Sequence, residues 1–153
     1  MTSEYIIPIS NKTLQGETAE IEKCNKFTKK MGLVLTPNEA LKLAEANALA
    51  LKSNGRIQFG DSTVREIIKE FYTSPYITKD NYLETINYLV EIFYFYKNET
   101  LDLIGDEDLI KYMKNSFDGV FQGSLDFLAG NELNILAISL RSGIEMGTKN
   151  VWN

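Results

Sequence analysis

The side chains in this sequence that can carry out chemistry are few, because histidine is absent altogether. Histidine most often transfers protons near neutral pH and most often ligates transition metals. Without it, the chain can build neither the Glu-x-x-His pairs of a carboxylate-bridged di-metal bundle nor a Cys–His nucleophile around Cys24. We expect no catalytic residue, no metal site and no cofactor. The sequence thus leaves enzymatic activity open and favours a non-catalytic protein.

Acidic residues and one serine supply the remaining candidates. Magnesium prefers oxygen ligands, and Glu17 with Glu20, or Glu99 with Asp102, has the spacing that places two carboxylates on one helix face. The two pairs lie far apart in the sequence, so we interpret them as solvated helix faces. Ser62 has the position of the phosphopantetheine-carrying serine of an acyl carrier protein, but serine is also an ordinary helix cap. We interpret Ser62 as a cap.

The charge of the chain argues against two classes of partner. A net charge of −5 and a pI near 4.8 repel phosphate backbones and anionic lipid surfaces. The one basic cluster, formed by Lys23, Lys26, Lys29 and Lys30, fits a solvated helix face. The sequence also lacks an apolar run of the roughly 20 residues that a membrane span needs. We therefore predict no nucleic-acid partner and no membrane partner.

Length and cysteine content indicate one intracellular domain. A single cysteine cannot form an internal disulfide, and the first residues lack the pattern of a secretory signal, so we expect a cytoplasmic protein. A chain of 153 residues with 44% hydrophobic residues can bury one substantial core. We place the helical domain at residues 17–142, between an extended lead-in at 1–16 and a loose tail at 143–153.

One hydrophobic stretch dominates the fold prediction. Residues 88–96 are apolar or aromatic at nearly every position, so a helix over about residues 78–98 must be enclosed by other elements. Thr36 and Glu39 have capping-box spacing and mark a helix start, and Gly55 marks the end of that helix. We predict an all-α, single-domain bundle of six or seven helices around the central helix, with at most one very short strand pair.

Several short motifs occur together between about residues 20 and 135. They are Cys24-Asn25-Lys26-Phe27, Gly55-Arg56 with Phe59-Gly60, Ser74-Pro75-Tyr76, Phe93 to Tyr96 followed by Lys97-Asn98-Glu99, and Gln122-Gly123-Ser124. Together they resemble a family of small uncharacterised bacterial proteins that is classed only as a domain of unknown function. The resemblance implies a bacterial cytoplasmic protein and brings no activity with it.

Polar side chains at the predicted helix ends are not explained by helical periodicity. If the central helix runs antiparallel to its neighbours, some of these ends converge and form a pocket for a ligand or a partner. The candidate pocket residues are Arg56, Tyr76, Tyr96, Asn98, Glu99, Gln122 and Ser124. The alternative is that each side chain only caps a helix or hydrogen-bonds local backbone.

Two functions follow from these patterns. We expect a non-catalytic protein–protein interaction module or homo-oligomer, which binds through apolar and aromatic surface left over after the core is packed. The alternative is a small-molecule-binding protein or enzyme that uses the polar helix ends. Because residues 93–96 place four aromatic rings on successive positions, at least one ring must point away from the core, and Tyr94 or Tyr96 is the candidate.

Overall fold

The computed structural model describes residues 11–58, 62–132, 135–136 and 138–141, and this part contains seven α-helices, two further helical turns and no strand. The elements are α2 (Asn11–Lys23), α3 (Asn25–Thr28), η1 (Lys29–Met31), α4 (Pro37–Ser53), α5 (Thr63–Phe71), α6 (Tyr82–Glu99), α7 (Asp106–Asp118), α8 (Leu125–Phe127) and the π-helical turn η2 (Leu128–Glu132). The predicted all-α bundle of six or seven helices is confirmed.

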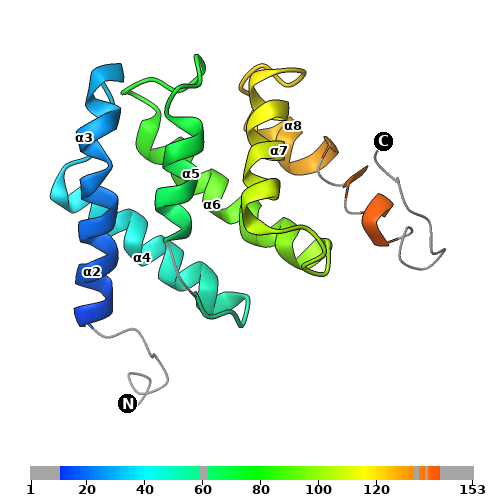
Figure 1. The fold of residues 1–153 in the computed structure, drawn as a ribbon, viewed down its shortest axis with the longest axis horizontal. Coiled ribbons are helices and arrows are strands. Elements are labelled where there is room, and N and C mark those ends of the chain that lie inside the picture. The colour runs from blue at the N-terminus through cyan, green and yellow to red at the C-terminus, as the bar shows by residue number, and fades with distance from the viewer. Residues whose placement is uncertain (1–10, 59–61, 133–134, 137, 142–153) are drawn as a thin grey trace.

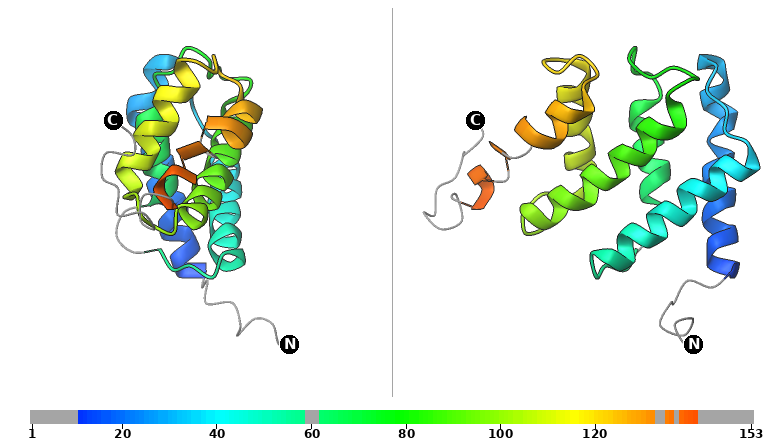
Figure 2. Two further views of the ribbon diagram at one scale, coloured as in Figure 1. Left: turned by 90° about the vertical axis from the view of Figure 1, so that its right-hand side faces the viewer. Right: turned by 180° about the vertical axis from the view of Figure 1, so that it is seen from behind.

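The helices are arranged in two layers (Figure 1). One layer holds α2, α5 and α7, and the other holds α4 and α6, as the end-on view makes clear (Figure 2). Successive helices therefore form three hairpins: α2 with α4, α5 with α6, and α7 with the segment that begins at α8. Contacts run from α2 to α4, from α4 to α6, and from α5 to both α6 and α7. Each hairpin thus buries its apolar faces against its neighbour, as stacked helical hairpins do.

The connections lie at two opposite edges of this array. Residues 32–36, 72–81 and 119–124 turn the chain within hairpins at the upper edge in Figure 1. Residues 54–58 and 100–105 follow the ends of α4 and α6 at the lower edge. The candidate pocket residues, which are near helix ends, therefore lie in two groups, one at the upper edge and one at the lower edge.

The predicted central helix is α6, and it contacts helices of both layers. Its exposed side includes Glu84, Glu91 and Asn98, which follow one another at intervals of seven residues and therefore form a polar stripe on one face. Phe95 lies on the same stripe and is half exposed, whereas Tyr94 and Tyr96 are buried. One aromatic ring does point outward, but it is Phe95 and not one of the two tyrosines, because Phe95 is four residues after Glu91 and three before Asn98.

Local signals set the start of two helices as predicted. At α4, Thr36 Oγ1 accepts from Glu39 N at 3.1 Å and Glu39 Oε1 accepts from Thr36 N at 2.9 Å, which completes the capping box. At α5, Ser62 Oγ accepts from Arg65 N at 3.2 Å, so Ser62 is a helix cap. Gly55 follows α4 with φ 64°, a left-handed conformation that glycine adopts without strain.

Two predicted boundaries are wrong. The predicted lead-in ends at residue 16, but α2 already begins at Asn11, because its packing along α4 outweighs the low helix propensity of Gly16. The central helix begins at Tyr82 and not at 78, since residues 78–81 close a turn in which Asn81 N donates to Thr78 O at 3.1 Å. The predicted lead-in residues 1–10 and the tail at 143–153 lie outside the described residues.

Candidate functional site

The seven predicted pocket residues do not form one site. Arg56, Tyr96, Asn98 and Glu99 belong to the lower half of the array, where α4 and α6 end. The segment 72–81, which contains Tyr76, and the segment 119–124, which contains Gln122 and Ser124, lie at the opposite edge (Figure 1). The lower group and the upper group must therefore be considered separately.

In the lower group, Arg56 and Asn98 come together. Nε and Nη2 of Arg56 donate to Asn98 Oδ1 at 2.9 and 2.7 Å, and Nη2 also donates to Asp102 Oδ1 at 2.8 Å. Asn98 Nδ2 in turn donates to Asn54 Oδ1 at 2.5 Å. The left-handed Gly55 turns the chain after α4, and the next side chain, Arg56, reaches the end of α6. The side-chain amide of Asn98 thus connects the end of α6 to the end of α4, which lies in the same layer.

Lys97 adds a second cation beside Arg56 and is only 7% exposed. Its Nζ donates to Ile104 O at 2.7 Å and lies 2.8 Å from Asp106 Oδ1 and 3.8 Å from Asp102 Oδ1. A buried ammonium is costly unless it is paired and hydrogen-bonded, and this one is both. Lys97 therefore holds the loop after α6 and the start of α7 in place.

A polar cavity of about 560 Å³ lies beside these ion pairs. The cations Arg56 and Lys97 and the carboxylates of Asp102 and Asp106 all line it, so its charged side chains sum to zero. Tyr94 lines it as well, and burial raises the pKa of Tyr94 to about 12, so its hydroxyl stays protonated at neutral pH. The cavity can hold a polar ligand through hydrogen bonds, but its ions already neutralise one another.

Two of the predicted lower residues face other partners. Glu99 Oε1 accepts from Arg141 Nη1 at 3.1 Å, and the same nitrogen donates to Glu99 O at 2.9 Å. The hydroxyl of Tyr96 donates to Ala129 O. These contacts connect the third hairpin to α6. Of the predicted lower residues, Arg56 and Asn98 line the cavity.

The upper group is built around a close approach of two loops. Tyr76 packs against Gly123, where a Cβ atom would lie 2.6 Å from Tyr76 Cβ. Gln122 is exposed with φ 47°, and Ser124 Oγ accepts from Phe127 N at 3.3 Å at the start of α8. Ser124 therefore acts as a helix cap, and Tyr76 is part of the packing between the second and third hairpins.

The other chemical candidates in the sequence are occupied by structural contacts. Glu17 Oε2 accepts from Ser62 Oγ at 2.6 Å, while Glu20 pairs with Arg65 Nη1 at 3.0 Å, so the two carboxylates serve different partners. Cys24 is buried, and burial raises its pKa to about 11. Within the described ranges, no cluster of three or more histidine, cysteine, aspartate or glutamate residues is placed to hold a metal ion. Among the helices described, none combines the length and apolar character that crossing a membrane requires.

The sequence prediction missed Asn54, Asp102 and Asp106 as neighbours of Arg56 and Lys97. The two partners of the Arg56 guanidinium, Asn98 and Asp102, are 42 and 46 residues away in the chain. Neither hydrophobic periodicity nor capping rules report contacts at such separations. The sequence indicates only that Asn54, Asp102 and Asp106 are near predicted helix ends.

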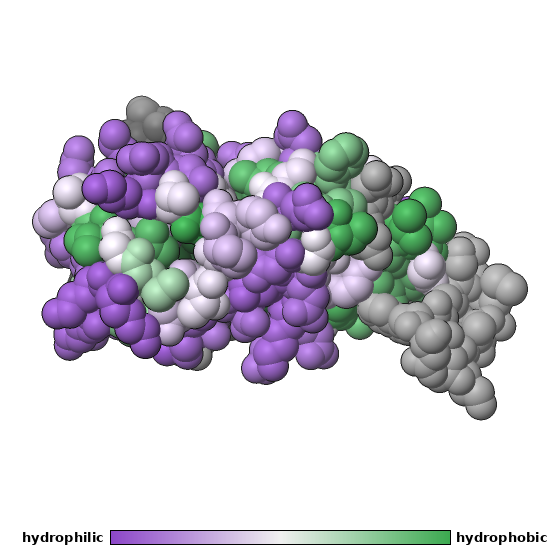
Figure 3. All heavy atoms as spheres, turned by 90° about the horizontal axis from the view of Figure 1, so that it is seen from above, coloured by the Kyte–Doolittle hydropathy of each residue, from purple (hydrophilic) through white to green (hydrophobic). Residues whose placement is uncertain are grey.

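Apolar side chains are exposed on the third hairpin. Val120 is 73% and Phe127 58% exposed, and the Phe127 ring stacks on Phe121 with centroids 6.0 Å apart. Ile135 and Ile138, one helical turn apart, are also exposed. We call these five residues the third-hairpin surface, and Figure 3 shows apolar atoms over this end of the molecule.

Comparison with known proteins connects this architecture to a family and to no activity. No curated protein and no solved structure matches the chain. A family described as being of unknown function, DUF6323, matches residues 20–146. This range contains all three hairpins except residues 11–19 of α2, together with the lower cavity and the third-hairpin surface. The chain belongs to this family of unknown function.

Proposed function

We propose that this protein is a helical scaffold that binds another protein chain through the third-hairpin surface. The observation that carries the proposal is the exposure of Val120, Phe127, Ile135 and Ile138 on the last hairpin that the structure describes. In stacked arrays each hairpin buries an apolar face against its neighbour. Exposed apolar side chains on such a hairpin suit a protein partner, whose core contacts are typically aromatic and aliphatic.

The aromatic pair of this surface has the character of a binding anchor. Phe121 and Phe127 stack on each other, so the exposed ring of Phe127 is held in place before a partner arrives. A rigid aromatic side chain loses little conformational entropy on binding and buries a large apolar area. We place this activity in a bacterial cytoplasm; the single, buried Cys24 supports a reducing compartment.

Co-purification with matched variants tests the proposal. A tagged protein in the cells that produce it is expected to recover a partner, or an untagged second copy, that is lost with Val120→Ser/Phe127→Ser. The control Glu107→Gln/Lys111→Gln changes the exposed face of α7, where these two residues form a 3.4 Å ion pair, and should recover the same partner as the wild type. Equal recovery with both double variants would exclude the third-hairpin surface as the binding site.

A small-molecule function has one observation in its favour, the cavity of about 560 Å³ beside Arg56 and Asn98. A ligand that binds only the folded protein raises its melting temperature. A thermal-shift screen of polar metabolites should then find a compound whose shift disappears in Arg56→Met. Arg65→Met should retain it, because Arg65 pairs with Glu20 and does not line this cavity. A screen without such a compound supports the scaffold function instead.

A further inference from the structure

Three exposed lysines form a basic group at the upper edge of the array, at the end opposite the third hairpin. Lys26, Lys29 and Lys30 lie within five residues in α3 and η1, and all three are exposed. The nearby Lys23 pairs with Glu20 at 3.2 Å, but the other three form no ion pair with a carboxylate in the part of the chain that the structure describes. Lysines near the C-terminal end of a helix interact favourably with the helix dipole, which accounts for their position. Their charges can still attract an acidic partner.

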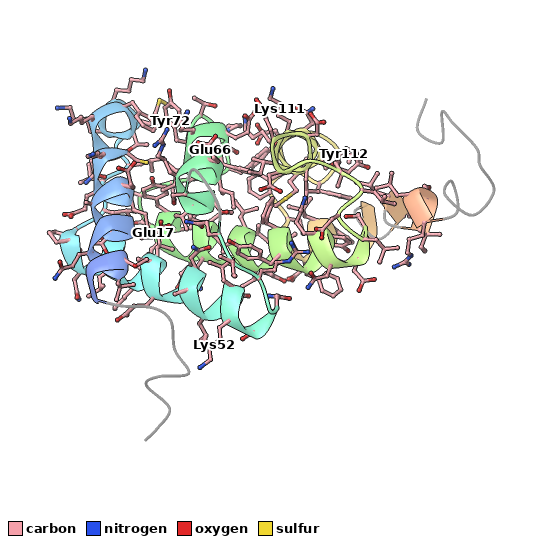
Figure 4. The ribbon with its side chains drawn as sticks, turned by 60° about the horizontal axis from the view of Figure 1, so that its bottom comes forward. Glu17, Lys52, Glu66, Tyr72, Lys111 and Tyr112 are labelled. Carbon is pink, nitrogen blue, oxygen red and sulfur yellow. The ribbon has the colours of Figure 1, made fainter. Side chains whose placement is uncertain are left out.

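Apolar side chains surround the same helix end. Met31 is 49% and Val34 56% exposed, directly after the lysines. Phe27 packs edge-on against Tyr72 with ring centroids 5.1 Å apart, and Lys30 Nζ lies 5.8 Å from the centre of the Tyr72 ring. Figure 4 shows Tyr72 between the end of α3 and α5, and Figure 3 shows an apolar area at this end surrounded by hydrophilic atoms.

We propose that this surface, which we call the basic tip (Lys26, Phe27, Lys29, Lys30, Met31, Val34 and Tyr72), binds an acidic, apolar peptide segment of another protein. Carboxylates of the peptide pair with the three lysines, and its aliphatic or aromatic side chains cover Met31 and Val34. This contact is separate from the third-hairpin surface, because the two lie at opposite ends of the array (Figure 1). It therefore adds a second binding site to the proposed function.

The charge of the whole chain selects a peptide over a larger anionic surface. The net charge is −5 even with the three lysines included, so an extended membrane or nucleic acid would face repulsion from the rest of the molecule. A short acidic segment meets only the local positive field of the tip. Screening confines that field to about 10 Å at 0.1 M salt.

A second copy of this chain is a less suitable occupant. Its densest acidic group, Asp106, Glu107 and Asp108, lies in the first turn of α7. Asp106 already pairs with Lys97 at 2.8 Å, and Glu107 pairs with Lys111 at 3.4 Å. Docking on the basic tip of another copy would therefore compete with ion pairs that this acidic group already makes within its own chain.

Fluorescence anisotropy with a defined probe tests the proposal. The probe is a fluorescein-labelled peptide composed of glutamate, leucine and phenylalanine, and the control peptide carries glutamine in place of glutamate. Lys29→Gln/Lys30→Gln should weaken binding of the acidic peptide about tenfold, since an exposed ion pair contributes up to about a factor of five. The matched variant Lys42→Gln/Lys52→Gln removes two exposed lysines of α4, and Figure 4 shows Lys52 at the opposite edge. This variant should bind the peptide like the wild type, whereas Met31→Ser should bind it more weakly.

Four outcomes would overturn the proposal. They are equal weakening in both lysine variants, equal binding of the glutamine peptide, lysine-dependent binding to phosphatidylserine vesicles without binding to the peptide, and a dimer in light scattering that the Lys29→Gln/Lys30→Gln change dissociates. The first would reveal a net-charge effect, the second a purely apolar contact, the third a membrane surface and the fourth a second copy. Because the peptide assay uses purified protein, it is independent of partner capture by the third-hairpin surface.

Discussion

At Leu101 the chain adopts a conformation that usually belongs to glycine. Its φ is 56°, and the bonds from Leu101 N to Asn98 O at 3.0 Å and from Asp102 N to Lys97 O at 2.9 Å form a Schellman motif after α6. A residue with a Cβ atom is strained in the left-handed region. The motif places Asp102 beside Arg56, so the strain is maintained by the ion pairs of the lower group.

Replacing Leu101 tests how much strain this position holds. Leu101→Gly is expected to increase the free energy of unfolding by about 1 kcal/mol, because the left-handed cost disappears and the side chain is mostly exposed. Urea denaturation measures the change. Leu103→Gly, in the same loop, is the control and should not stabilise the protein. A loss of stability in Leu101→Gly would mean that the leucine side chain makes a contact that outweighs the strain.

Cys24 makes stability depend on pH above neutrality. Burial raises its pKa from 9.0 to about 11, so between these values the folded protein retains a proton that the unfolded chain has lost. The stabilising effect is complete below pH 9 and is lost as the pH rises through the folded value. Between pH 9 and 10, ionisation of Cys24 in the unfolded chain should lower the unfolding free energy by up to about 1.4 kcal/mol per pH unit. The tyrosines whose pKa values burial raises add to this fall in the wild type and in Cys24→Ala alike. Urea midpoints should decline less steeply in Cys24→Ala, and parallel declines would contradict this assignment.

The sequence predicts single-residue roles well where they are local. Thr36, Ser62 and Gly55 act at helix ends as their neighbours in the chain require. It could not predict that Lys97 is buried, because the carboxylates that compensate its charge lie on a loop and on the next helix. The residue types near a helix end predict where the helix ends, whereas tertiary packing determines whether a side chain there is buried.

At the scale of elements, the second and third hairpins are joined through their upper turns. Ser74 Oγ donates to Asp118 Oδ1 at 2.6 Å, and Asp118 Oδ2 pairs with Lys114 Nζ at 3.0 Å. The ring of Tyr76 packs edge-on against Phe117 with centroids 6.1 Å apart and leaves space only for a glycine at 123. These contacts orient the third-hairpin surface relative to α6.

A pair of glycine variants measures this contact. Gly123→Ala introduces both left-handed strain at φ 85° and a clash with Tyr76, whereas Gly55→Ala introduces strain at φ 64° in open space. Gly55→Ala should cost about 1 kcal/mol of unfolding free energy and Gly123→Ala clearly more, about 2–4 kcal/mol. Thermal or urea unfolding compares them. Equal losses would show that the loop around Gly123 moves away from Tyr76 without cost.

The existence of most elements could be predicted, but their arrangement could not. Periodicity and caps locate α4, α5, α6 and α7 to within a few residues. The same periodicity cannot distinguish a bundle wrapped around α6 from three hairpins stacked in sequence, because both bury the same faces. The sequence predicts one or two regular helices over residues 120–129 and 131–141. The described part of this segment holds the short α8, the π-helical turn η2 and helical residues at 135–136 and 138–141.

At the scale of the whole molecule, the stacked order explains why the polar helix ends do not make one pocket. Within-hairpin turns and between-hairpin connections fall on opposite edges, so helix ends that looked equivalent in sequence are separated by the length of a helix. The stacked order also leaves apolar side chains exposed on the third hairpin, which is the last one in the described part of the chain. The architecture therefore supports a protein-binding scaffold more directly than a ligand site.

Site-specific photo-crosslinking in the producing cells tests the scaffold function most directly. A benzophenone amino acid at Phe127, on the third-hairpin surface, should give a discrete adduct with one protein after irradiation, either a partner or a second copy. The same group at Glu107, on the exposed polar face of α7, should give none, because that face is not proposed to bind. An adduct that appears equally from both positions, or from neither, would contradict a scaffold that binds through its third hairpin.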